Sequence, residues 1–175
     1  KVQNIERSIQ FYEQVIGFKV LERTEYEVTF TADGKRVLLT IEQPNDVVRK
    51  TENTTGLYHL ALLLPERRDL ANIVRHFASI GLQFGSADHL VSEALYLSDP
   101  DGNGIEIYID RHPSEWSWHN DEVAMTTDPL DFHDLLMIEG EWKGLPENTV
   151  MGHVHLQVAD LEQNEKFYID GLGFQ

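Results

Sequence analysis

Apolar residues near the start of the chain recur at helical spacing. Ile5, Ile9, Tyr12 and Ile16 fall on one face of a helix, and Gly17 supplies a stop after it. Strand-like stretches follow at 19–31 and 36–42, separated by the "ADGK" turn at 32–35. This first part of the chain therefore predicts a helix followed by strands.

A second unit begins at "GLYHLALLLP", residues 56–65. Alternation places Leu60, Leu62 and Leu64 on one face of a strand, and His59 and Ala61 on the other. A helix from about 66 to 80 follows, with Gly81 as its stop, and further strands are expected near 82–84, 93–98 and 104–110. The region up to residue 112 thus predicts two successive βαβββ modules. The helix has an apolar face formed by Leu70, Ile73, Phe77 and Ile80.

An internal repeat reveals a third module. The segments 2–18 and 158–174 match at a constant offset of 156, including "FYEQVIGF" against "FYIDGLGF". Asp160 is a plausible N-cap for the second helix, with Gln163 three residues later. We expect an N-terminal domain at 1–112 whose first strand is truncated, with Lys1 inside it. A connection at 113–148 with one short helix near 132–138 follows, and then the start of a second, truncated domain at 149–175.

Composition excludes several classes of function. The chain has 14 Lys and Arg against 30 Asp and Glu, a net charge of −16, and no clustered basic stretch that could follow a phosphate backbone. No apolar run approaches the ~20 residues that a membrane span needs, and the chain has no cysteine, so a metal must be held by His and carboxylate. We expect a cytoplasmic protein that binds neither nucleic acid nor membrane.

The stretch "LYLSDPDGNGIEIY", residues 95–108, places a glutamate inside an apolar strand. Ile105 and Ile107 share one face, whereas Glu106 and Tyr108 share the other. A buried carboxylate is costly unless something binds it, so Glu106 lies either on a wet sheet face or in a metal site. His59 poses the same choice, between a satisfied core histidine and a ligand.

The ordered motifs resemble the vicinal oxygen chelate superfamily, and within it the two-domain extradiol dioxygenases of the catechol 2,3-dioxygenase type. They are "FYEQVIGF", "HLALLLP", "LSDPDGNGIEIY", "MGHVHLQV" and "FYIDGLGF". The resemblance implies an α+β fold of tandem βαβββ modules, with a curved mixed sheet around a metal-binding cleft and helices outside. It also implies a homo-oligomer.

The resemblance implies a ligand set of two histidines and one glutamate. His59 matches the histidine on the first strand of the second module, and Glu106 matches the glutamate on its last strand. The remaining ligand stands 20 residues before the glycine of the "LGF" motif, which for the site of His59 and Glu106 is a position before Lys1. The same spacing in the third module gives His153, whose own partner ligands would lie beyond Gln175. Two histidines and a carboxylate suit Fe(II), with Mn(II) or Zn(II) as alternatives.

In such enzymes the metal binds a catechol-type aromatic diol, and dioxygen opens the ring beside the diol. A tyrosine ten residues before the glutamate and a histidine near the oxygen site assist with hydrogen bonding and proton transfer. Tyr96 matches the tyrosine, and His89 is the candidate for the histidine. Tyr96 could instead be packing, and His89 could be a solvated loop residue.

Two other functions of the same scaffold remain as alternatives: a lyase of the glyoxalase type and a small-molecule binding or resistance protein. A glyoxalase I site needs a carboxylate on the last strand of the first module. The shared Asp-Gly turn aligns Leu38 with Glu106 there, which disfavours that site.

Overall fold

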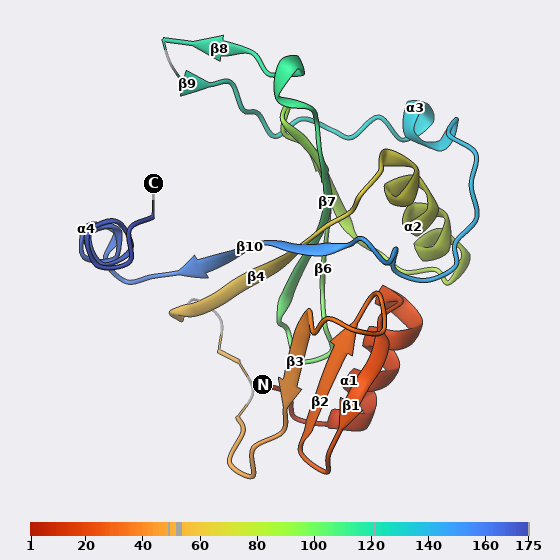
Figure 1. Cartoon of the computed structure of the whole chain (residues 1–175), viewed down its shortest axis with the longest axis vertical. Helices are drawn as coiled ribbons and strands as arrows, with labels where there is room; N and C mark the ends of the chain where they lie inside the picture. Colours follow the sequence, from red (N-terminus) through yellow and green to blue (C-terminus); the bar gives the residue numbers. More distant parts are fainter. Residues whose placement is uncertain (49, 52–53, 121, 175) are drawn as a thin grey trace.

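The computed structural model describes residues 1–48, 50–51, 54–120 and 122–174 and has two main sheets (Figure 1). One sheet is antiparallel, in the order β1-β2-β3; the other has five strands, in the order β10-β4-β7-β6-β5, and is mixed. The α+β class predicted from the sequence is confirmed. The strands are β1 (Lys19–Arg23), β2 (Glu27–Thr31), β3 (Leu39–Glu42), β4 (Gly56–Leu63), β5 (Gly85–Asp88), β6 (Ser92–Ser98), β7 (Gly104–Asp110) and β10 (Val150–Gln157).

The first helix packs against the three-stranded sheet. Helix α1 (Ile5–Phe11) is capped by Asn4 and continues as a π-helical turn, η1 (Tyr12–Ile16), which ends at Gly17 with φ +86°. The predicted helix over 5–16 is confirmed, with its last turn widened. Its predicted apolar face is buried in one core with residues of β2 and β3, namely Val28, Phe30 and Ile41.

The second unit has the predicted βαβββ order. Strand β4 leads into helix α2 (Arg67–Ser79), and β5, β6 and β7 follow, with the first and last strands adjacent and parallel. The expected strand at 82–84 was wrong: Leu82 and Phe84 pack against the core from a loop, and the strand forms at β5 instead. The stretch 19–31 forms two strands rather than one, because residues 24–26 form a turn in which the Thr24 N–H donates to the Glu27 carbonyl.

The two faces of the five-stranded sheet carry the predicted residues. Leu60, Leu62 and Ile107 are buried in the main core beside α2. Because side chains alternate along a strand, His59 and Glu106 lie on the opposite face. Both side chains are polar and yet buried, so each needs a polar partner or a bound ion to offset its lost hydration.

The "DPDGNG" turn joins the two units. Asp99 is buried, and its carboxylate accepts the backbone N–H groups of Asp101 and Asn103. The Tyr12 hydroxyl donates to Asp99 Oδ2 at 3.0 Å. These hydrogen bonds fix the start of β7 against η1.

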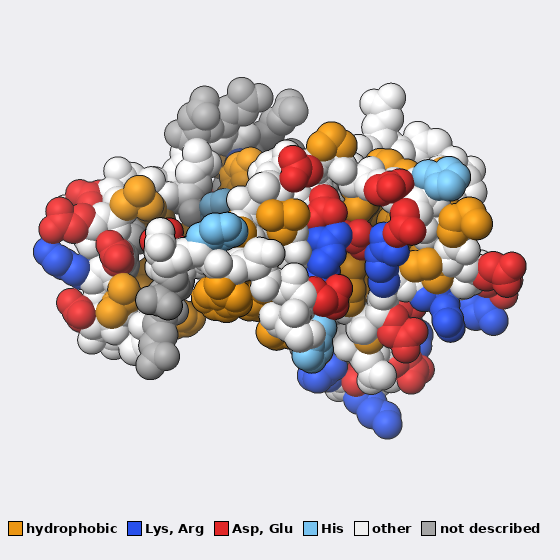
Figure 2. Space-filling model, turned by 90° about the horizontal axis from the view of Figure 1, so that it is seen from above, with side chains coloured by type: hydrophobic (Ala, Val, Ile, Leu, Met, Phe, Trp, Pro, Cys, Tyr) orange, Lys and Arg blue, Asp and Glu red, His pale blue; other side chains and the backbone are white. Residues whose placement is uncertain are grey.

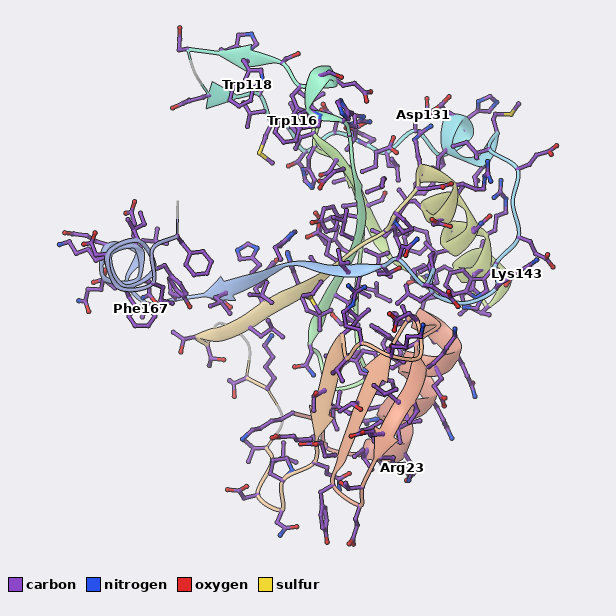
Figure 3. All side chains as sticks on the ribbon, viewed as in Figure 1. Arg23, Trp116, Trp118, Asp131, Lys143 and Phe167 are labelled. Carbon is purple, nitrogen blue, oxygen red and sulfur yellow. The ribbon has the colours of Figure 1, made fainter. Side chains whose placement is uncertain are left out.

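The connection at 113–148 is more structured than its sequence pattern indicates. It contains η2 (Pro113–Glu115), a hairpin of β8 (Trp118–His119) and β9 (Glu122–Val123), and α3 (Phe132–Leu136), which is the predicted short helix. Figure 3 shows Trp116 and Trp118 at this projecting hairpin, far from Lys143. The later half of the segment packs onto the first 112 residues, with Leu130, Leu135 and Leu145 in the main core.

Strand β10 pairs antiparallel with the free edge of β4. Helix α4 (Leu161–Lys166) follows, capped as predicted by Asp160 accepting the Gln163 N–H, and continues as a π-helical turn, η3 (Phe167–Gly171). The α4 segment stands apart from the two sheets in Figure 1, and Phe167 is exposed.

Charged side chains are mixed on the surface. On the face in Figure 2, Lys and Arg lie beside Asp and Glu rather than in a stripe of one sign. Among the described residues no helix is long and apolar enough to cross a membrane.

Candidate metal centre

Three neighbouring strands bring together His59, Glu106 and His153. In the register of the sheet, Ala61 of β4 lies opposite His153 of β10 on one side and opposite Glu106 of β7 on the other. His59 stands two residues before Ala61 on the same face of β4. The small side chain of Ala61 leaves space above the strand, so the three polar side chains can converge over it.

The distances among these groups suit one cation. Glu106 Oε2 lies 2.9 Å from His59 Nε2 and 3.2 Å from His153 Nε2, and the two nitrogens are 3.4 Å apart. Ligand atoms bound at about 2.1 Å and at right angles around a metal would lie about 3 Å from one another. The cluster is also the group of potential metal ligands found among the described residues, so the donor set fits a divalent ion.

Burial keeps His59 in the form that binds metal. Desolvation, together with the neighbouring His155 and His153, lowers the pKa of His59 to about 4. The imidazole of His59 is therefore neutral at pH 7. The side chain of Glu106 beside it is buried, with 4% of its surface exposed. A buried carboxylate beside a neutral imidazole is a site that favours a cation.

Tyr108 fixes the orientation of His153. The His153 ring points Nε2 at Glu106 and Nδ1 at the Tyr108 hydroxyl, 3.4 Å away. Gly152 allows this approach, because a Cβ there would lie 2.1 Å from the Tyr108 oxygen. Such an outer partner sets the ring orientation of a metal-binding histidine.

Tyr96 and His89 lie next to the cluster. Tyr96 stands directly opposite Glu106 in the β6–β7 pair. Burial and the Glu106 carboxylate raise the pKa of Tyr96, so its hydroxyl stays protonated. His89 Nε2 lies 2.8 Å from the Tyr96 hydroxyl, so these two candidate residues are in hydrogen-bonding contact.

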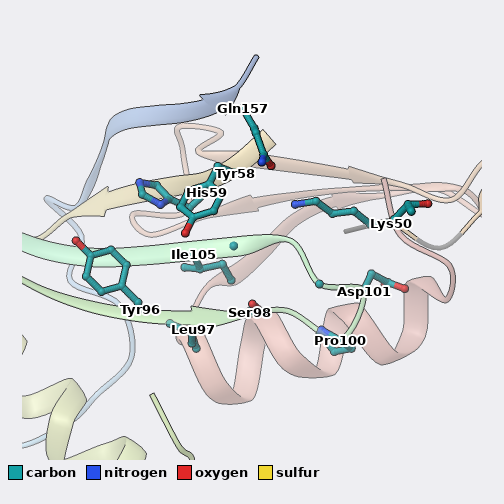
Figure 4. A pocket seen from close by; sticks show the side chains of 13 residues that line it. Lys50, Tyr58, His59, Tyr96, Leu97, Ser98, Pro100, Asp101, Ile105 and Gln157 are labelled. Carbon is teal, nitrogen blue, oxygen red and sulfur yellow. The ribbon is translucent and has the colours of Figure 1, made fainter. Parts of the chain in front are cut away.

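A cavity opens beside the cluster (Figure 4). Its volume is about 580 Å³, and His59 and Tyr96 form part of its wall. Leu97 and Ile105 add apolar surface, and Lys50 lies toward the other end in Figure 4. The space is large enough for a one-ring aromatic molecule that contacts His59.

The structure assigns His153 a different setting from the one expected. The sequence pattern places it on the first strand of a third module, with its partner ligands beyond Gln175. In the structure β10 lies beside β4, and His153 meets His59 and Glu106. Strand pairing between segments about 90 residues apart has no local signal in the sequence. The same holds for Thr126, whose carbonyl oxygen lies 2.7 Å from His89 Nδ1.

The chain is similar in sequence to a protein superfamily and to two dioxygenases. The profile of the Glyoxalase/Bleomycin resistance protein/Dioxygenase superfamily matches residues 1–107. The chain is 48% identical over 177 residues to catechol-2,3-dioxygenase of Bacillus subtilis, covering 99% of this chain and 62% of that protein. It is 30% identical over 148 residues to biphenyl-2,3-diol 1,2-dioxygenase 3 of Rhodococcus globerulus, covering 81% of this chain and 78% of that protein.

Solved structures share the fold. A glyoxalase/dioxygenase from Nostoc punctiforme matches with a TM-score of 0.53 and 21% identity, over 63% of this chain and 86% of its own. The cppA protein of Streptococcus pneumoniae matches with a TM-score of 0.55 and 14% identity, over 90% of this chain and 57% of its own. At these identities the likeness concerns the fold alone.

Proposed function

The chain belongs to the Glyoxalase/Bleomycin resistance protein/Dioxygenase superfamily, as its motifs predicted, and we propose that it serves metal-dependent extradiol cleavage of a catechol-type aromatic diol by dioxygen. The chain spans 62% of the length of its Bacillus relative. The observation that carries the proposal is the convergence of His59, Glu106 and His153 beside a cavity of molecular size.

We propose His59, His153 and Glu106 as the residues that hold the metal, with Fe(II) as the ion and Mn(II) or Zn(II) as alternatives. When bound, the ion would supply Lewis-acid chemistry at the diol and electron transfer to dioxygen. The two imidazoles contribute no charge and the carboxylate contributes one negative charge, so a divalent ion keeps a positive charge that attracts an ionised diol.

The cavity walls orient the substrate. Leu97 and Ile105 provide apolar contact for an aromatic ring, and Tyr58 adds an aromatic face. An aromatic ring bound there would place its diol edge toward His59 and Tyr96. Holding the ring in one orientation favours attack at the bond beside the diol.

Tyr96 and His89 are the proposed proton-handling residues. The protonated Tyr96 hydroxyl can donate a hydrogen bond toward the cavity or to His89 Nε2. As the diol loses a proton, Tyr96 Oη can accept it while passing its own proton to His89 Nε2. His89 would then act as the base at the end of a two-residue relay.

Oxygen uptake tests the proposal. The Fe(II)-loaded protein should consume dioxygen with a catechol and form a yellow ring-opened semialdehyde, and His59→Ala or Glu106→Ala should abolish both signals. His112→Ala is the matched control, because it also removes a histidine, but one that caps the short helix η2 by accepting the Ser114 N–H and lies outside the three-residue cluster. Bound metal without oxygen uptake across a panel of catechols would contradict the proposal and would favour a glyoxalase-type lyase or a binding protein.

The remaining proposals rest on composition and resemblance. We propose a cytoplasmic homo-oligomer that binds no nucleic acid, organised as the ranges 1–112, 113–148 and 149–175. The mixed charges in Figure 2 and the net charge of −16 support the absence of a nucleic-acid partner. Light scattering of the purified protein would measure the assembly state.

A further inference from the structure

His89 sits in a tightly constrained turn between β5 and β6. Its own N–H donates to the Ser92 carbonyl at 2.9 Å, and the next residue, Leu90, adopts φ +67°. This left-handed conformation is costly for a residue with a branched side chain, so other contacts must maintain it. One is the Asp88 carboxylate, whose Oδ1 accepts the Leu90 N–H at 2.8 Å.

An ion network around the buried Glu93 holds Asp88. The guanidinium of Arg111 donates to both carboxylate oxygens of Asp88, at 2.6 and 2.7 Å, and also to Glu93 Oε1 at 3.1 Å. Glu93 is 3% exposed and accepts two further hydrogen bonds from Arg67, at 2.6 and 2.9 Å. Paired, two-point contacts of this kind fix direction as well as distance, so the turn is tied to β6, β7 and α2 together.

The segment after the β8–β9 hairpin fixes the His89 ring from its other side. Asp128 exchanges two backbone hydrogen bonds with Asp88, at 2.8 and 2.9 Å, and this pairing brings the Thr126 carbonyl 2.7 Å from His89 Nδ1. A carbonyl oxygen can only accept, so Nδ1 must carry a proton. In the neutral ring Nε2 then has a lone pair, and it faces the Tyr96 hydroxyl at 2.8 Å.

We propose that the Thr126 carbonyl and the Asp88–Arg111–Glu93 network hold His89 as the Nδ1–H tautomer, with Nε2 presented as a proton acceptor to Tyr96. Asp88, Glu93 and Arg111 are positioning residues, since they act through His89 and do not line the cavity. The catalytic consequence rests on the proposed function, whereas the tautomer does not.

The tautomer can be measured directly. In a long-range ¹H–¹⁵N spectrum of the labelled, metal-free chain, His89 should show a protonated Nδ1 and an unprotonated Nε2; the His89→Gln variant identifies its signals. Arg111→Gln should move both nitrogens toward the values of a mixed tautomer. Asp88→Asn, which keeps an acceptor for the Leu90 N–H, gives a second and milder test.

Arg75→Gln is the matched control. Arg75 also ties α2 to a neighbouring segment, through the Leu136 carbonyl, but no part of that contact reaches the His89 turn. It should leave the His89 signals unchanged even if its stability falls as much as that of Arg111→Gln. In the Fe(II)-loaded protein, Arg111→Gln should lower kcat roughly tenfold to a hundredfold with little change in KM, and Arg111→Lys should recover part of the loss.

The two arms separate the possible failures. An Nε2–H tautomer in the unaltered chain, or unchanged His89 signals in both network variants, would overturn the proposal. A purely structural network would lower the melting temperature without moving the tautomer or kcat, and would overturn it as well. If the unaltered chain consumes no oxygen, the proposed function fails, and the spectrum still decides the tautomer.

Discussion

The two buried glutamates of the five-stranded sheet should respond in opposite ways to loss of charge. Glu93 and Glu106 are 3% and 4% exposed. Glu93 is paired with the guanidinium groups of Arg67 and Arg111. Glu106 instead faces the nitrogens of His59 and His153 and the hydroxyl of Tyr96, and has no cationic side chain of Lys or Arg among these partners. We therefore expect Glu106→Gln to stabilise the metal-free protein, because it removes a buried charge that awaits a cation.

The magnitude follows from the burial of each carboxylate. Desolvating an ion costs several kcal/mol after relaxation, and two hydrogen bonds from imidazole N–H groups to Glu106 would offset part of this. We expect a net gain of about 1–3 kcal/mol for Glu106→Gln, which is roughly 2–12 °C for a chain of this size. Glu93→Gln should instead cost about 2–4 kcal/mol, because it removes the buried carboxylate that Arg67 and Arg111 share.

Thermal unfolding with and without metal measures both effects. In a chelator, Glu106→Gln should melt above the unaltered protein and Glu93→Gln below it. With a divalent ion at about 100 times its Kd, the unaltered protein should gain about 2.7 kcal/mol, and Glu106→Gln should gain nothing. A Glu106→Gln variant that melts lower without metal, or that still responds to metal, would refute the reasoning.

Three further changes test separate parts of the site. The free energy of unfolding of the metal-free protein should fall as the pH drops from about 6.5 toward 4 and then level off, because the pKa of His59 is ~6.5 in the unfolded chain but about 4 in the folded protein. Urea titrations across this range would detect a loss of at most ~3 kcal/mol. An unchanged pH dependence in His59→Gln would contradict this reasoning. Tyr96→Phe should lower kcat by on the order of a hundredfold while metal affinity, followed by calorimetry, stays the same; an unchanged kcat would exclude the relay. Gly152→Ala should weaken metal binding about tenfold, since its Cβ would displace the Tyr108 ring that orients His153; circular dichroism should show an intact fold, and unaltered affinity would remove Tyr108 from the site.

Local patterns in the sequence predicted most of the fold. The helix face of Ile5, Ile9 and Tyr12 and the alternation around Glu106 each depend on residues close together in the chain, and the structure has both. The strand expected at 82–84 was wrong because apolar residues in a loop can pack as well as those in a strand. The sequence around Leu82 does not distinguish a strand from a loop that packs against the core.

The candidate site was predictable only in part. His59 and Glu106 could be placed on one face, because the strand period determines the direction of each side chain. That His153 completes the cluster depends on β10 pairing with β4, which brings together residues 94 positions apart. The contact of Thr126 with His89 is likewise a product of tertiary packing, so no spacing in the sequence could have indicated it.

Anaerobic titration of the metal-free protein with Fe(II), followed by calorimetry, tests the central claim most directly. The account predicts one tight site per chain that is lost in His59→Ala, Glu106→Ala and His153→Ala. His155→Ala, which removes a histidine from the same strand as His153, should keep the site. Full binding by His153→Ala, or loss of binding in His155→Ala alone, would contradict it.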